Sequence, residues 1–174
     1  MTDTSAPTRR VELRVRNRPS ACVIDAVETT ISRLEHLAEI DAIATLEVET
    51  WNTTTLDTID ACESENATAP VERFRAWARR RGCTLEPAFR RRTVDSLIVS
   101  ETSTELVVPI VTVAVYEGDD LACVAPCVSG DDVYTVDDCL RALEDGSTEL
   151  LPSSFGQGES SEDLDRPDRE WASA

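Results

Sequence analysis

The clearest concentration of side chains able to do chemistry is a run of arginines between residues 71 and 92. This stretch holds eight arginines and two glutamates, a local charge of +6 in a chain whose net charge is −17. The planar guanidinium fork matches the geometry of a phosphate group. The sequence therefore predicts an anion site here, and its candidate contacts to phosphate or nucleic acid are Arg73, Arg79, Arg80, Arg81, Arg90, Arg91 and Arg92.

A structural interpretation of the same arginines stays open beside the functional one. Arg79 to Arg81 fall in the last turn of a predicted helix, where cations complement the helix dipole. Arg90 and Arg92 are spaced to share one face of a strand, where they can pair across a sheet with Glu47 and Glu49. Salt weighs against simple phosphate binding, because a protein with about 6–10 phosphate contacts loses about 10³–10⁵ in affinity between 50 and 200 mM salt.

The six cysteines offer one candidate thiol and no metal site. Cys22 follows Pro19 and Ser20 at the predicted start of a helix, where the amide dipoles favour a thiolate; the alternative is a small packing residue. Cys123 and Cys127 would lie roughly 13 Å apart on an extended strand, too far to share one zinc ion. We find no catalytic constellation and no cofactor motif, so we expect a non-catalytic protein.

Composition indicates a salt-adapted, cytoplasmic protein. All 17 basic residues are arginines, against 34 acidic residues, and such an acidic surface suits molar salt, where charges are screened over about 3 Å. No apolar run resembles a signal peptide or reaches the length of about 18 residues typical of a membrane span. We expect a disordered N-terminus over residues 1–8, a single α/β domain over 9–145 and a disordered acidic tail over 146–174.

Hydrophobic periodicity predicts the main elements. Val11, Leu13 and Val15 alternate with charged residues, the pattern of a strand with one covered face. The other expected elements are a helix from Ser20 to about Ile40, a strand over 46–50, a helix from 68–70 to Gly82, a β-rich run over 105–116, a strand over 121–127 and a helix over 134–143.

The second half resembles thioredoxin-like proteins. Val107-Val108-Pro109 before a strand, an acidic glycine turn, a further strand and a final helix are similar to their cis-proline strand, hairpin and closing helix. The resemblance implies a thioredoxin-like βαβαβββα sandwich, with a cis Pro109 near the first helix as fold marker; a ferredoxin-like α+β fold is the alternative. Pro19-Ser20-Ala21-Cys22 keeps only the last cysteine of a CxxC motif, so the attacking thiol of disulfide exchange is missing.

A second resemblance is to a haloarchaeal family often labelled helix-turn-helix domain proteins. It is carried by the segments 9–13, 72–77, 89–92, 125–127 and 134–136. The label implies DNA binding, although the sequence shows no helix pair joined by a three- or four-residue turn. Our leading hypothesis is a binding or regulatory module with a protein or nucleic-acid partner. The alternatives are a DNA-binding transcriptional regulator using the Arg73–Arg92 cluster and a monothiol redox protein using Cys22.

Overall fold

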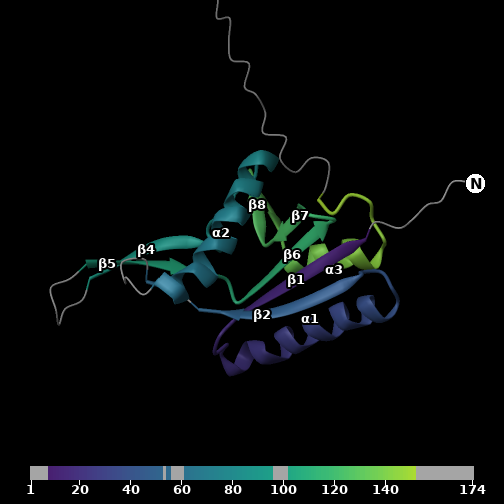
Figure 1. Cartoon of the computed structure of the whole chain (residues 1–174), viewed down its shortest axis with the longest axis horizontal. Helices are drawn as coiled ribbons and strands as arrows, with labels where there is room; N and C mark the ends of the chain where they lie inside the picture. Colours follow the sequence, from purple (N-terminus) through teal and green to yellow (C-terminus); the bar gives the residue numbers. More distant parts are fainter. Residues whose placement is uncertain (1–7, 53, 56–60, 96–101, 152–174) are drawn as a thin grey trace, which may run out of the picture.

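A four-stranded mixed sheet organises the chain. The computed structural model describes residues 8–52, 54–55, 61–95 and 102–151. The strand order in the main sheet is β2-β1-β6-β7, in which β1 is parallel to β2 and antiparallel to β6, and β7 is antiparallel to β6 (Figure 1). These strands are β1 (Arg9–Arg16), β2 (Thr45–Trp51), β6 (Val111–Glu117) and β7 (Asp120–Ala125).

Two smaller sheets flank the main one. The first has the order β3-β5-β4, and the second is the hairpin β8-β9. Their strands are β3 (Thr54–Thr55), β4 (Arg90–Asp95), β5 (Thr102–Val107), β8 (Cys127–Ser129) and β9 (Asp132–Tyr134). Thr84 also bridges to Val128, so the loop after the second helix is attached to the hairpin. The described chain is therefore a mixed α/β structure with its strands in small sheets.

Helices cover both faces of the main sheet. The described helices are α1 (Ala21–Glu39), α2 (Ala61–Arg81) and α3 (Val136–Glu144). In Figure 1, α1 and α2 lie on opposite sides of the strands β1 and β2. The α1 side packs Leu34 and Leu37 into the same core as Val11 and Leu13 of β1, all at most 1% exposed. No described helix has both the length and the apolar character needed to cross a membrane.

Strand β1 forms where its alternation predicts, but both of its faces are buried. Glu12 and Arg14, expected on an open face, are only 5% and 9% exposed. They form an ion pair with each other, and Glu12 also accepts a hydrogen bond of 3.2 Å from the Tyr116 hydroxyl. Arg73 of α2 donates to that hydroxyl at 3.4 Å. A polar strand face can be buried here because Glu12 and Arg14 pair with each other and find further partners in Tyr116 of β6 and Glu49 of β2.

The β-rich run of residues 105–116 is divided at Pro109. Its first part pairs with β4 in the small sheet, and its second part pairs with β1 in the main sheet. Proline has no amide hydrogen for the ladder, so a strand rarely continues through it. The expectation of a cis bond before Pro109 is wrong: the cis bonds among the described residues precede Pro87 and Pro126, and Val108–Pro109 is trans.

Helix α2 begins earlier than the sequence pattern suggests. We expect its start at residues 68–70, because proline favours the first turn of a helix. In the structure α2 begins at Ala61 and Pro70 lies inside it. Alanine and glutamate are frequent between residues 61 and 69 and extend the helix N-terminally. The predicted stop is confirmed, since Gly82 has a φ of 68°.

The segment after α3 packs against the body of the protein, at least as far as Leu150. Leu150 is 5% exposed, and its carbonyl accepts a hydrogen bond from the Tyr134 hydroxyl. Arg9 donates to the carbonyl of Ser147 at 2.7 Å. Leu150 thus packs four residues beyond the start of the tail expected at residue 146; residues 152–174 lie outside the described part, so the disordered tail stays a prediction.

Arg33 fastens α1 to α3, and this contact should be sensitive to acid. It pairs with Asp137 at 2.6 Å and Glu144 at 2.7 Å, and the Arg33 hydrogen bond lowers the pKa of Glu144. A lowered pKa stabilises the fold above the ordinary glutamate pKa of about 4.3, and this stabilisation is lost as the pH falls through the folded-state pKa.

We therefore expect Glu144→Gln to cost about 0.5–1 kcal/mol near neutral pH, the range for exposed ion pairs. At a pH of about 3 the cost should shrink, because Glu144 is then increasingly protonated in the wild type too. Urea unfolding at both pH values measures this. The matched control is Glu35→Gln, at an exposed carboxylate of α1 that has no ion-pair partner in the described part. An equal cost at both pH values would contradict the assignment.

Candidate anion-binding surface on helix α2

The last three turns of α2 have a buried apolar face and an exposed face that is bordered by arginines. Val71, Phe74, Trp77 and Ala78 are each at most 3% exposed and point into the core. At 100° per residue, the other positions as far as Arg80 fall on the opposite side, and among them the exposed Glu72 lies close to its centre; Arg81 falls on the apolar side at the helix end. On the opposite side the exposed Ala76 also lies near the centre, and the arginines lie along the two margins: Arg73 and Arg80 on one, Arg75 and Arg79 on the other.

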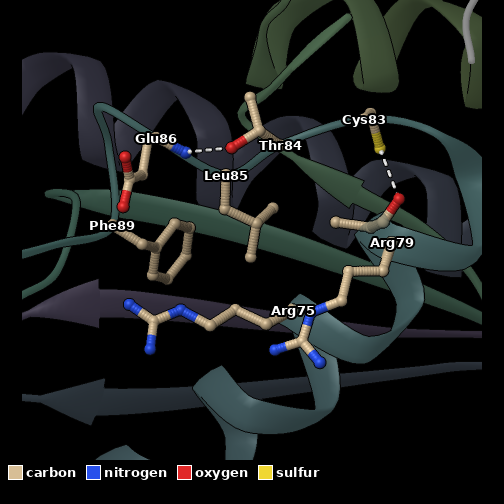
Figure 2. A pocket seen from close by; sticks show the side chains of 8 residues that line it. Arg75, Arg79, Cys83, Thr84, Leu85, Glu86 and Phe89 are labelled. Atoms are coloured by element: carbon tan, nitrogen blue, oxygen red, sulfur yellow. Dashed lines mark hydrogen bonds between the residues drawn. The ribbon is translucent and has the colours of Figure 1, made fainter. Parts of the chain in front are cut away.

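One margin borders a small cavity. Figure 2 shows Arg75 and Arg79 extending from α2 to the same side, below Leu85 and Phe89. The cavity has a volume of about 170 Å³, and Thr84 and Glu86 complete its wall. Arg75 donates to the Glu72 carboxylate at 3.1 Å, whereas Arg79 has no ion pair in the described part of the chain. An anion entering here would find one paired and one unpaired guanidinium.

The other margin of α2 has one arginine that a hydrogen bond holds in place, Arg73, and one that has no ion pair in the described part of the chain, Arg80. Arg73 is held by its hydrogen bond to the Tyr116 hydroxyl. Burial raises the pKa of Tyr116, so this phenol stays neutral, and the negative charge that acts on Arg73 at this contact is that of Glu12, which accepts a hydrogen bond from the same hydroxyl. Arg80 is exposed, and so is Arg81 at the end of the helix. Neither has an ion pair within the described residues.

Charge is segregated between the two sides of the main sheet. Four exposed acidic residues lie on α1: Asp25, Glu28, Glu35 and Glu39. Eight of the fifteen described arginines pair with carboxylates, as Arg10 does with Glu47 at 2.9 Å, and four of the seven unpaired ones lie on α2. The unpaired arginines of α2 therefore form a basic surface on the side of the sheet opposite an acidic one (Figure 1).

The arginines of β4 do not join this surface as a group. Arg92 pairs with Glu105 at 2.6 Å, and Arg91 reaches Glu72 at 3.5 Å. The expected pairing of Arg90 and Arg92 with Glu47 and Glu49 is wrong, because β4 belongs to the small sheet rather than the main one. In the structure, Glu47 and Glu49 pair with Arg10 and Arg14 of β1.

The cysteines include a pair that sequence reasoning misses. Thr84 and Val128 exchange both backbone hydrogen bonds at 2.8 Å, which brings Cys83 and Cys127 to the same short bridge. A hydrogen bond from the Cys127 thiol lowers the pKa of Cys83, and Arg81 adds to this effect. The same bond and burial raise the pKa of Cys127. The two residues lie too far apart in the chain for any spacing rule to link them.

Cys22 is exposed at the start of α1, where its sulfur lies 3.1 Å from the Ser20 hydroxyl. We expect Cys22 to alkylate first and Cys83 second among the five cysteines with described side chains. Cys123, Cys127 and Cys139 should react slowly because they are buried. Mass spectrometry after a short alkylation pulse measures the order. If a buried thiol reacts before Cys22, the redox alternative loses its support.

Within the described ranges no group of three or more His, Cys, Asp or Glu side chains is arranged to hold a metal ion. A sequence family described as a helix-turn-helix domain matches residues 3–148. No curated protein and no solved structure matches the chain. The matched range contains α2, both of its arginine margins and the sheet that positions them.

Proposed function

This chain belongs to the helix-turn-helix domain family, and on that premise we propose that it is a non-catalytic, DNA-binding regulatory protein. The observation that carries the proposal is the exposed side of α2, where arginines without carboxylate partners lie along both margins of the helix. An exposed arginine without an ion pair costs little stability in an ordinary protein. In a chain of net charge −17, however, carboxylates that could pair with it are abundant. Arg79, Arg80 and Arg81 nevertheless form no ion pair in the described part of the chain, although Glu72 lies on the same helix and Glu86 lines the cavity beside Arg79. This suits a partner that brings its own negative charge.

The dimensions of α2 suit the major groove of duplex DNA. A helix with its side chains is about 10–12 Å across, and the groove is about 12 Å wide. Phosphates line both sides of the groove, so arginines on both margins of the helix reach both strands. Ala76, small and exposed, allows the helix axis to approach the base edges. The acidic α1 side would be repelled by DNA, which fixes the orientation of approach.

DNA would be read differently from a standard helix-turn-helix. In the ranges that the structure describes, α1 and α2 are separated by β2 and β3, and no two helices are joined by a three- or four-residue turn. The proposed reading helix is instead presented by the main sheet, through the packing of Phe74 and Trp77. The main sheet has the strand order β2-β1-β6-β7, and its strands and the three helices follow one another as strand, helix, strand, helix, two antiparallel strands and helix. This order supports a thioredoxin-like relationship, although Pro109 is trans.

The proposal is tested by removing two unpaired arginines. Fluorescence anisotropy with a labelled duplex, in about 0.2 M potassium chloride, should show Arg79→Gln/Arg80→Gln binding at least tenfold more weakly than wild type. Two charge-assisted contacts of about 1 kcal/mol each would give roughly a thirtyfold loss. Because both positions are exposed, the fold should be unaffected.

The matched control removes the same charge elsewhere. Arg92 and Arg141 are exposed, and both are paired with carboxylates. The variant Arg92→Gln/Arg141→Gln should bind within about twofold of wild type, since the summed charge alone acts weakly beyond a Debye length of about 8–10 Å. Equal losses in the two variants would show a general charge effect and contradict a contact through α2.

A further inference from the structure

A second cavity, larger and mostly apolar, has Leu85 in common with the cavity beside Arg75 and Arg79 but includes no residue of α2 in its lining. Its volume is about 510 Å³, and it is bounded by the turn after Leu85, the segment between β5 and β6, and the hairpin β8-β9. Its apolar walls include Pro87, Pro109, Ile110, Pro126 and Val133. Pockets for small molecules are typically about 300–1,000 Å³, apolar, and supplied with a few polar groups.

Two arginines line this cavity and converge on one short segment. Arg90 is directly opposite Val107 in the β4-β5 ladder. Arg16 donates its backbone amide to Ile110 at 2.7 Å, and its guanidinium lies 3.5 Å from the Val108 carbonyl. Within the segment from Val107 to Ile110, Arg90 therefore lies beside Val107 and the guanidinium of Arg16 lies beside Val108. Neither arginine has a carboxylate partner among the described residues.

The rim of the cavity is unusually apolar for an exposed surface. Val133 is 60% exposed and is one of the few large hydrophobic side chains of the described chain in that state. It lines the same cavity as the two arginines. A ligand with an apolar body would cover Val133 and remove that surface from water. A ligand with a planar anionic group would satisfy a guanidinium fork.

We propose that this cavity is an effector site for a small carboxylate with an apolar body, such as an aromatic or branched-chain acid. The carboxylate binds Arg16 and Arg90, and the apolar part lies against the prolines and Val133. The site does not depend on the proposed DNA contacts, because neither arginine belongs to α2. Arg79→Gln/Arg80→Gln should therefore bind the carboxylate as the wild type does.

Phenylacetate is a suitable probe, with phenylacetamide as its neutral isostere and inorganic phosphate as an anion without an apolar body. We expect phenylacetate, titrated into the full chain and followed by ¹H–¹⁵N correlation spectra, to shift amide signals around the cavity, including those of Val108 and Val128. Phenylacetamide and phosphate should each bind at least tenfold more weakly, since each lacks one of the two interactions.

Variants locate the binding. Arg16→Gln or Arg90→Gln should weaken phenylacetate binding about tenfold, whereas Arg92→Gln on the same strand should leave it unchanged. Val133→Asp, at an exposed position that a polar residue tolerates, should weaken it too by placing a negative charge at the rim. The proposal is overturned if phenylacetate produces no shifts around the cavity, if phosphate or phenylacetamide binds as tightly, or if the Arg16 and Arg90 variants bind like wild type.

Discussion

Replacing Glu12 by glutamine should destabilise the folded chain by about 3 kcal/mol, the lower end of the range for breaking a buried ion pair. Glu12 is 5% exposed and faces Arg14 and the Tyr116 hydroxyl. Glutamine keeps the size of the side chain but removes the charge, so the buried Arg14 guanidinium loses one of its two carboxylates. The other, Glu49 at 2.8 Å, limits the loss.

Urea unfolding at constant potassium chloride measures this effect without changing the ionic strength. The matched control is Glu47→Gln, directly opposite Glu12 on the neighbouring strand β2, where the pair with Arg10 is 36% and 46% exposed. That pair should be worth at most about 1 kcal/mol. Equal losses at Glu12 and Glu47 would contradict the claim that burial makes the Glu12–Arg14 pair more important to stability than the exposed pair.

The second large effect concerns salt. We expect the thermal midpoint to rise by about 10 °C or more between about 0.1 M and 2 M potassium chloride, which corresponds to a few kcal/mol for a chain of this size. The net charge of −17 repels itself in the folded state. The screening length falls from about 10 Å at 0.1 M to about 3 Å at 1 M. Salt also weakens the exposed ion pairs, but these are worth at most about 1 kcal/mol each.

Removing unpaired carboxylates from α1 tests whether charge repulsion causes this response to salt. Glu28 and Glu35 are exposed and have no ion-pair partner in the described part of the protein. The variant Glu28→Gln/Glu35→Gln should gain stability at low salt and respond less steeply to added potassium chloride. An unchanged response would indicate that salt acts through burial of apolar surface, which excluded salts also favour, rather than through charge.

Local hydrophobic periodicity was sufficient to predict the elements that consist of one regular apolar pattern. Helix α1 and strands β1 and β2 lie within a residue or two of the expected ranges. The sequence pattern was insufficient where a missing amide hydrogen or a contact with a distant segment determines where an element begins or ends. Pro109 divides one β-rich run between two sheets, and the helix formers before Pro70 carry α2 nine residues upstream of the expected proline start.

The sequence predicts which residues make up the candidate site, but it does not predict which of them come together in space. The arginine-rich stretch predicts a basic region on α2, and helical periodicity places Arg79 and Arg80 on the exposed side of that helix, where the structure has them. The ion pairs of Arg91 and Arg92 depend on a small sheet that no local signal specifies. Likewise, Arg16 and Arg90 line one cavity only because β1 ends and β4 begins beside the segment from Val107 to Ile110.

The central claim is that the exposed side of α2 contacts DNA, and a carboxylate placed in its middle tests this most directly. Ala76→Glu adds one negative charge between the arginine margins, and Ala26→Glu adds the same charge to the exposed side of α1; both alanines are exposed, and glutamate suits a helix. We predict that Ala76→Glu binds a duplex at least tenfold more weakly than wild type, a loss of about 1.4 kcal/mol, while Ala26→Glu binds within about twofold. Equal affinities of the two variants, measured by anisotropy at one salt concentration, would contradict the proposed DNA contact through α2.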